Sequence, residues 1–550
     1  MRHPALVVAL MAMLLLAPAL VLGTLISHSS PQNLTWAGQF SEQFRAGTLY
    51  PRWMSESFDG LGSPTFYFYP PLPFWIDALV SVLTFNVLSV PYRLAVTSVL
   101  ILWASGLTMR AWLLRTTGNR TADLLGALAY MAAPYHLLDY YMRGAFAEFT
   151  AYALLPLIVL AIRLIADRRR AGLVLLTLSY GGLLMSHLPT ALLASVTVIP
   201  AYVLFRAWRL GERRAVAGML LRCLMGGALG IGLAALYLVP ALELQDWISA
   251  DELWTSFYRV ENWFVLAPER WVDPATMRAI ASLALAAAVL GVGLWIVLLQ
   301  MPAGDMRRQE FGFWIAICLV CLALMVGLVP WFWELPLLLK VQFPWRLMVV
   351  AEFAAITALC LTPFGAVRPR VAYIFIAAAV ALAPGAVLIV TDAAARIDFT
   401  WRSRPLDRHD VKEYQPRGYK QAGSRYADLG LEPLKDVPAI SCTPAARICR
   451  GENGRFGAMR ITVDSDAPTK VVLRRFFFPA WQVDTGLGTG ASLGPTEPLR
   501  LVSFQAPAGQ TVARLDRVAL PAERWGWAIS GLSLLLLLAA LLASARNSAR

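Results

Sequence analysis

Long apolar segments recur along most of this chain, and they constrain its fold more than any other feature. The first segment, residues 5–26, is long enough to cross a bilayer, whose hydrocarbon core takes about 20 helical residues to span. Of the 550 residues, 58% are hydrophobic and only 15% are charged, which excludes soluble globular proteins and disordered chains. The sequence therefore predicts an α-helical polytopic membrane protein.

The number of spans depends on how residues 72–90 are placed. This segment is interrupted by prolines and carries Asp77 and Asn86, which favours a helix lying along the outer interface over one that crosses. With that placement, the arginine-rich loops all fall on the cytoplasmic side, in accord with the positive-inside rule. The roughly twelve predicted spans are residues 5–26, 93–113, 121–137, 147–166, 171–186, 189–207, 215–238, 277–299, 311–330, 346–364, 371–391 and 524–543.

The formal net charge of +13 is concentrated in short loops between the apolar segments. This distribution is an insertion signal and indicates no nucleic-acid partner. The apolar run at the N-terminus is longer than the core of a secretory signal, and we interpret it as a retained first helix. The sequence contains no P-loop, dinucleotide-binding fingerprint or zinc motif. It therefore indicates no cofactor, and a divalent metal ion is left open.

Polarity rises after residue 391, and period-two alternation appears, for example at residues 459–463, so this region is predicted to be mainly β. Cys442 and Cys449 lie in this polar region and would form a disulfide if it is exported. The predicted domains are a transmembrane domain at 1–391 with a large first outer loop at 27–92, a small extracytoplasmic β-rich domain at 392–523, and a C-terminal transmembrane helix with a cytoplasmic tail at 524–550.

Ionisable residues among aromatic rings in the first outer loop are the first candidates for a functional site. Glu42 and Asp59 are candidate bases, and Arg52 could hold a phosphate. Tyr69 belongs to an aromatic run that could contact a sugar or lipid donor. Aromatic rings also settle at the lipid–water interface, so anchoring is the alternative interpretation of this loop.

The later outer segments add further candidates. Arg143 and Glu148 either pin their loop as an ion pair, or hold a phosphate and act as a base. His187 lies where two spans meet and is either a hydrogen-bonded structural residue or a catalyst. Arg346, in a turn that also carries Lys340, could neutralise a phosphate leaving group or anchor the helix at the interface.

Several short motifs resemble those of a known family. The first loop reads AGTLYPRW at residues 46–53, followed by GLGSP and FYPPL, and the later motifs are YMRG, SHL, QFPWR and EYQP. Together they resemble the bacterial multi-pass membrane proteins labelled 6-pyruvoyl-tetrahydropterin synthase-related, a label that implies no pterin chemistry. A further motif, FPAW at residues 478–481, resembles the related YfhO-like proteins. The resemblance covers nearly the whole chain.

This group is similar to the C-type glycosyltransferase (GT-C) superfamily, whose members take a sugar from a polyprenyl-phosphate carrier at the outer membrane face. The resemblance implies a GT-C-like fold in the bacterial inner (cytoplasmic) membrane. It also implies a polyprenyl-phosphate sugar donor, membrane lipid, and an extracytoplasmic glycan or lipid acceptor as partners. The expected reaction is an inverting transfer, with a carboxylate as base and arginines on the departing phosphate. Where relatives tend to show an Asp and a His, this chain reads HSSPQN at residues 28–33, so the usual base is displaced or missing.

Two other functions stay open. A chain that kept the fold and lost its base would be a non-catalytic lipid- or glycan-binding membrane protein. A cavity open to the inner face would instead indicate a transporter for lipid-linked sugars. A carboxylate close to a bound lipid phosphate would favour the glycosyltransferase.

Overall fold

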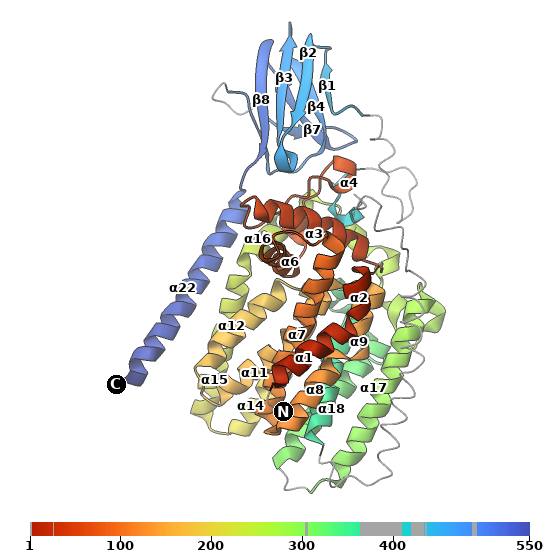
Figure 1. The fold of residues 1–550 in the computed structure, drawn as a ribbon, viewed down its shortest axis with the longest axis vertical. Helices are drawn as coiled ribbons and strands as arrows, with labels where there is room; N and C mark the ends of the chain where they lie inside the picture. Colours follow the sequence, from red (N-terminus) through yellow and green to blue (C-terminus); the bar gives the residue numbers. More distant parts are fainter. Residues whose placement is uncertain are drawn as a thin grey trace.

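The computed structural model describes residues 3–25, 27–302, 306–362, 410–419, 434, 437–486 and 492–549. Within these residues, a bundle of helices carries a small β-sandwich at one end (Figure 1). The helix α22 (Pro521–Ala549) runs from the sandwich back along the bundle, where it contacts α16 and α15. The protein is thus mainly helical with a β region near its C-terminus, as the sequence predicts.

Most of the helices are apolar, because their segments carry few charges. The described helices are α1 (Pro4–Leu15), α2 (Ala17–Leu22), α3 (Ser30–Arg45), α4 (Ser57–Gly60), α5 (Thr65–Phe68), α6 (Leu72–Leu83), α7 (Val90–Thr117), α8 (Arg120–Met131), α9 (Pro134–Leu138), α10 (Phe146–Ala151), α11 (Leu155–Ala166), α12 (Ala171–Leu184), α13 (Leu188–Val196), α14 (Val198–Leu210), α15 (Arg213–Leu233), α16 (Ala235–Glu243), α17 (Pro274–Gln300), α18 (Met306–Val326), α19 (Met348–Leu361) and α22. Eight stretches among the described residues are long and apolar enough to cross a membrane.

The predicted spans coincide with these helices, with differences at two places. The first predicted span is broken at Leu16 into α1 and α2. The predicted span at 371–391 lies outside the described residues. Each of the other predicted spans overlaps one or two of the helices, because the long apolar runs that define a span also define a helix in a bilayer.

The helix α6 agrees with the expectation for residues 72–90. It has 12 residues, which at about 1.5 Å per residue is too short to cross the hydrocarbon core. In Figure 1 it is seen nearly end-on beneath α3, so both helices run across the direction of the long helices. Arg93 of α7 joins them, because its buried guanidinium donates to Asp77 of α6 at 2.9 Å and to Ser41 of α3 at 2.9 Å.

Two antiparallel four-stranded sheets, in the orders β1-β4-β7-β6 and β2-β3-β8-β5, form the sandwich. The strands are β1 (Ile440–Thr443), β2 (Ile448–Asn453), β3 (Met459–Ser465), β4 (Thr469–Phe476), β5 (Trp481–Asp484), β6 (Gly494–Pro495), β7 (Leu501–Ala506) and β8 (Gly509–Arg517). Every second side chain of β3 is buried, which is the period-two pattern of a strand with one face in the core. A disulfide between Cys442 and Cys449 joins β1 of one sheet to β2 of the other.

The sandwich rests on the first loop of the helical region. The ring of Trp53 packs against that of Trp481 at 5.0 Å between centroids, and Phe58 packs against Phe476 at 5.7 Å. Near Trp53, the buried side chain of Arg52 pairs with Glu523 at the start of α22, at 3.0 Å. We call residues 50–67 the sandwich seat, because they fix the sandwich to the bundle.

Candidate functional site

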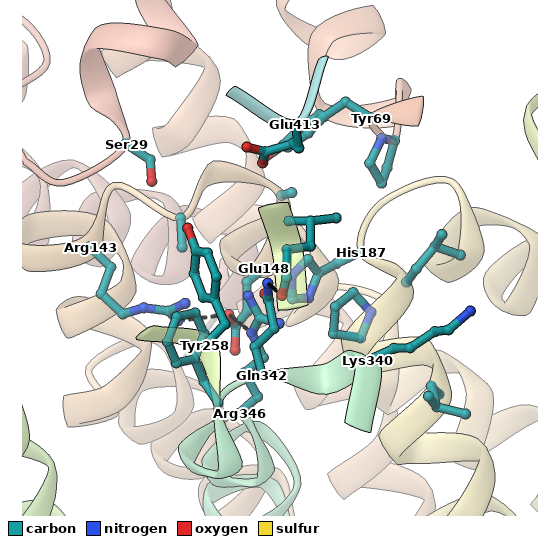
Figure 2. Close-up of a pocket in the computed structure, with 18 of the residues that line it drawn as sticks. Ser29, Tyr69, Arg143, Glu148, His187, Tyr258, Lys340, Gln342, Arg346 and Glu413 are labelled. Atoms are coloured by element: carbon teal, nitrogen blue, oxygen red, sulfur yellow. Dashed lines mark hydrogen bonds and ion pairs between the residues drawn. The ribbon is translucent and has the colours of Figure 1, made fainter. Parts of the chain in front are cut away.

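A cavity of about 900 Å³ lies between the helices and the loops near the sandwich seat. Its wall combines the start of α3, residues 68–70, the loop before α10, the turn between α12 and α13, the segment around 253–258, the turn at 340–346 and residues 411–414. Segments far apart in the sequence therefore meet at one place. Figure 2 shows Arg143, Glu148 and Arg346 gathered on one side of this cavity, with Ser29 and Glu413 on the other.

Local backbone geometry brings the first and second loops together. Gly144 adopts φ +60°, and a Cβ at this position would clash with the Ser27 hydroxyl and lie 3.0 Å from the Ser30 backbone nitrogen. The Ser29 backbone N–H donates to the Arg143 carbonyl at 3.0 Å, and the Asn33 side-chain amide donates to the Gly144 carbonyl at 2.7 Å. A glycine is required here because only its lack of a side chain allows so close an approach.

Arg143 is the centre of a buried polar cluster. Its Nη1 donates to Asp139 at 2.6 Å, to Glu148 at 2.7 Å and to the Tyr135 hydroxyl at 2.9 Å. The Tyr135 hydroxyl donates in turn to the other oxygen of Glu148 at 2.8 Å. The ion pair between Arg143 and Glu148 that the sequence suggests is therefore present, and both residues also line the cavity.

The turn before α19 adds a second guanidinium. Gln342 adopts φ +69°, ψ −54°, where a non-glycine residue stores about 1–3 kcal/mol of strain. The resulting tight turn, closed by the Phe343 N–H on the Val341 carbonyl at 2.8 Å, aims Arg346 at the cluster. The Arg346 Nε lies 3.5 Å from Glu148, so one carboxylate faces two guanidiniums.

The charge of the cluster depends on Asp139. Burial, and after it the negative charge of Glu148, raises the pKa of the Asp139 carboxyl well above its usual range. Its Oδ2 is buried and has no hydrogen-bond partner among the described residues, which disfavours the charged form further. The cluster thus contains two guanidiniums and two carboxylates, and burial disfavours the charged form of one of these carboxylates.

His187 lies beside Glu148, at the start of α13. Its Nδ1 is 2.8 Å from the Thr190 hydroxyl. Burial lowers the pKa of His187 to about 3, so the imidazole is neutral at physiological pH. A neutral imidazole can accept or donate a hydrogen bond in the cavity, but it adds no charge for an anion.

Aromatic rings form much of the remaining wall. Phe343 stacks on Trp345 at 4.6 Å between centroids, and Trp263 packs edge-on against both rings. On the α3 side, Trp36 packs against Tyr69 at 4.7 Å. Such rings suit the apolar faces of a sugar or an isoprenoid chain.

Four buried polar atoms of the cavity-lining residues make no hydrogen bond within the described part of the chain. They are Gln32 Oε1, Trp36 Nε1, Trp345 Nε1 and Arg346 Nε, none of which makes a hydrogen bond to any described residue. Leaving such an atom unsatisfied costs about 1–3 kcal/mol. This set of one acceptor and three donors fits a ligand rich in hydroxyl and phosphate oxygens.

The structure separates the candidate residues into two groups. Arg143, Glu148, His187, Arg346 and Tyr69 line the cavity together. Arg52, Asp59 and Glu42, the other candidates from the first loop, do not line it. The first loop is thus divided between the cavity wall and the sandwich seat.

Each of the three excluded residues has a physical reason for its position. The side chain of Arg52, which is 1% exposed, is drawn toward Glu523 and donates to the Leu236 carbonyl at 2.7 Å. Asp59, in an exposed turn, pairs with Arg474 of the sandwich at 3.2 Å. Glu42 is exposed on the solvent side of α3.

Sequence reasoning missed several cavity residues as site candidates, among them Glu413, Gln342 and Gln32. Glu413 and Gln342 stood within motifs that carried the family resemblance, EYQP and QFPWR, but nothing in the local sequence places them in a cavity. Gln32 belongs to the HSSPQN string, where an acidic residue was expected. No group of three His, Cys, Asp or Glu residues within the described ranges is arranged to hold a metal ion.

The fold and the cavity define a polytopic membrane protein with a polar, aromatic-walled pocket beside a β-sandwich. The chain belongs to the family described as "6-pyruvoyl-tetrahydropterin synthase related domain; membrane protein", which matches residues 66–399. That range includes Arg143, Glu148, His187 and Arg346. The family named from the sequence motifs is thereby confirmed.

Among solved structures, the chain is similar to ArnT from Cupriavidus metallidurans bound to undecaprenyl phosphate. The two are 14% identical, with a TM-score of 0.31, over 65% of this chain and 77% of that chain. A similarity at this level carries no argument about fold or function. No curated protein matches the chain.

Proposed function

We propose that this protein is a membrane glycosyltransferase that moves a sugar from a polyprenyl-phosphate donor to an acceptor hydroxyl. The observation that carries the proposal is the pair of buried guanidiniums, Arg143 and Arg346, on one side of an aromatic-walled cavity. A buried cluster of ionisable groups in a membrane protein is costly unless it is paired, hydrated or used. A lipid phosphate is an anion that such a cluster can bind from the membrane.

Two arginines suit a phosphate better than lysines do, because each planar guanidinium can donate two parallel hydrogen bonds. The Nη1 of Arg143 is occupied by protein partners, whereas the Nε of Arg346 has no hydrogen-bond partner among the described residues. Glu148 holds the two side chains beside each other. It acts here as the residue that positions the phosphate-binding pair.

The apolar chain of the donor has a path of its own. Leu184 at the end of α12, together with Leu188 and Leu192 of α13, lines the cavity on the side of the long helices. An isoprenoid chain can leave the phosphate along these residues toward lipid. The sugar then lies among Trp36, Tyr69 and the unpaired amide oxygen of Gln32, where rings and hydrogen-bond groups alternate.

The arginine-rich loops support an extracytoplasmic location for the cavity and the sandwich in the bacterial inner membrane. The helix α12 ends, and α13 begins, at the cavity. The loops at residues 168–170 and 211–214 therefore lie at the opposite end of the bundle, where the positive-inside rule places the cytoplasm. A cysteine introduced at the exposed Asn119 should react only with reagents that reach the cytoplasm, and labelling from outside would contradict this orientation.

One observation favours a second function. At the start of α3, His28, Ser29 and Gln32 line the cavity, and none of them is acidic. A protein that binds lipid-linked sugars without transferring them would also have this cavity and its arginines. If the protein is a transferase, another residue must therefore take the proton from the acceptor hydroxyl.

The test uses the purified full-length protein in lipid nanodiscs with a panel of radiolabelled polyprenyl-phosphate sugars. We expect saturable binding of polyprenyl phosphate and release of labelled sugar to water or to a glycan acceptor. The double variant Arg143→Gln with Arg346→Gln should lose both, whereas Arg270→Gln, an exposed arginine near the end of a loop, should lose neither. Binding without any release would favour the binding protein, and absence of binding would overturn both functions.

A further inference from the structure

The acceptor side of the cavity holds a carboxylate that the pair of arginines does not use. Glu413 belongs to a short 3-10 turn, η12 (Lys412–Tyr414), which reaches the cavity from the segment before the sandwich. Figure 2 shows its carboxylate across the cavity from Arg143, Glu148 and Arg346. Ser29 lies on the same side as Glu413.

Glu148 is poorly placed to accept a proton from a substrate. One of its oxygens accepts from Arg143 at 2.7 Å and lies 3.5 Å from Arg346, and the other accepts from the Tyr135 hydroxyl at 2.8 Å. A carboxylate with this many donors is a weak base, because each hydrogen bond stabilises its charged form. Its contacts instead fix the two guanidiniums.

The backbone around Glu413 is held from two sides. Asp410 accepts a hydrogen bond from Thr65 of the sandwich seat at 2.9 Å. On the other side, the Ser249 N–H donates to the Gln415 carbonyl at 2.9 Å. The turn is therefore fixed between two loops, and its side chain has a defined place in the wall.

Among the described residues, no side chain forms an ion pair or hydrogen bond with the Glu413 carboxylate, which accepts a hydrogen bond from its own backbone N–H. The charged groups that act on it most are Asp410 and Glu252, both acidic. Burial first, and then these negative charges, raise the pKa of Glu413 to about 7. A general base is most effective when its pKa lies near the working pH.

Tyr69 connects the two sides of the cavity. Its hydroxyl feels the charges of Arg346, Arg143 and Glu148 on one side and of Glu413 on the other. Glu413 is thus within electrostatic reach of the groups that surround Arg143 and Arg346. The cavity between Glu413 and the two arginines leaves space for a reacting sugar. The carboxylates of Glu148 and Glu413 have different surroundings and are therefore suited to different tasks.

We propose that Glu413 is the general base of the transfer and that Glu148 is a positioning residue for Arg143 and Arg346. The proposal rests on the glycosyltransferase function proposed above. The Glu413 carboxylate takes the proton of the acceptor hydroxyl, whose oxygen forms a bond to the anomeric carbon. The bond from that carbon to the phosphate oxygen breaks, and its electron pair leaves with the polyprenyl phosphate held by the two arginines. Glu413 then releases its proton to water.

The test compares Glu413→Gln, Glu413→Asp and Glu148→Gln in the transfer assay and in polyprenyl phosphate binding. We expect Glu413→Gln to slow transfer by about 10²–10⁴-fold with binding unchanged, and Glu413→Asp to retain part of the rate. Glu148→Gln should instead weaken binding of the phosphate. Glu243→Gln, an exposed carboxylate at the end of α16, is the matched control and should behave as wild type.

Two further readouts separate a base from a merely structural residue. The wild-type rate should rise with pH and level off above about 7, and Glu413→Gln should lose this rise. Azide, which needs no base, should restore transfer in Glu413→Gln by forming the glycosyl azide. A Glu413→Gln variant with the wild-type rate and pH profile would overturn the role of Glu413 alone. Wild-type protein that binds polyprenyl phosphate and transfers to neither water nor acceptor would overturn the proposed function itself.

Discussion

Two buried arginine–carboxylate clusters each join residues far apart in the sequence, and they differ in what they face. In the sandwich seat, Arg52 pairs with Glu523 at 3.0 Å and stacks on the ring of Tyr50 at 3.8 Å. In the cavity, Arg143 and Arg346 share Glu148. The first cluster joins two parts of the protein, whereas the second lines a cavity. The same residue types thus stabilise the fold in one place and are available to a ligand in the other.

The largest expected effect is on stability and concerns the seat. Replacing Arg52 with Ala removes the nearer of the two cations of the buried Glu523 and leaves Arg517 at 3.6 Å, so the free energy of unfolding should fall by about 3 kcal/mol, the low end for a broken buried pair. Asp59→Ala is the control, because it removes an ion pair whose carboxylate is 61% exposed and should cost less than about 1 kcal/mol. Thermal unfolding in detergent measures both. Equal effects for the two variants would contradict the structural role of Arg52.

The second prediction changes the shape of a cationic side chain and keeps its charge. Arg143→Lys retains the cation but loses the planar fork, so polyprenyl phosphate binding should weaken about tenfold, or about 1.4 kcal/mol. The matched variant Arg52→Lys should leave binding unchanged. Titration of polyprenyl phosphate against the intrinsic tryptophan fluorescence gives both affinities. If the two variants weakened binding alike, the division between seat and cavity would be wrong.

The third prediction uses the pH dependence of stability. The pKa of Glu413 is raised to about 7 in the folded protein, from its ordinary value near 4.5. Between pH 4.5 and 7, the folded protein therefore keeps a proton on Glu413 that the unfolded chain has already lost. Stability from this group therefore falls as pH rises from about 4.5 to 7 and is constant above. Glu413→Gln should match wild type at pH 4 and exceed it at pH 8 by about 1–2 kcal/mol. The gain is limited because the side chain is only partly buried.

The measurement for that prediction is the melting temperature of both proteins across the pH range. A constant difference between them would mean that Glu413 does not titrate in this window.

The smallest effect concerns the turn that aims Arg346. Gln342→Gly removes the strain of a positive φ and should stabilise the protein by about 1 kcal/mol. Because glycine also loosens the turn, affinity for polyprenyl phosphate should fall slightly. Thermal unfolding and the same fluorescence titration measure the two changes. A loss of stability would show that the Gln342 side chain contributes more than its backbone conformation costs.

The sequence predicted the features that depend on local pattern. Apolar runs located the helices, alternation located the strands of the sandwich, and the prolines around residues 72–90 indicated the short helix α6. The spacing of Arg143 and Glu148 in one loop suggested their ion pair. In each case the relevant neighbours are close in the chain, so the pattern contains the information.

The rest depends on contacts between distant segments. Arg52 lies in an aromatic loop typical of a ligand site, but its partner Glu523 is near the other end of the chain. Glu413 stands in a segment that the sequence assigned to the soluble domain. Its place in the cavity follows from the contacts of its neighbours, Asp410 with Thr65 and Gln415 with Ser249. Neither placement could be inferred without the fold.

The turn that carries Glu413 has a consequence for biogenesis. Val411 and Tyr414 complete the cavity wall together with Glu413, yet a ribosome reaches them only after every described cavity-lining helix has been synthesised. A nascent chain arrested before this point has the arginines but lacks one wall. Chains truncated before residue 411 should therefore insert into the membrane without completing the wall of this cavity.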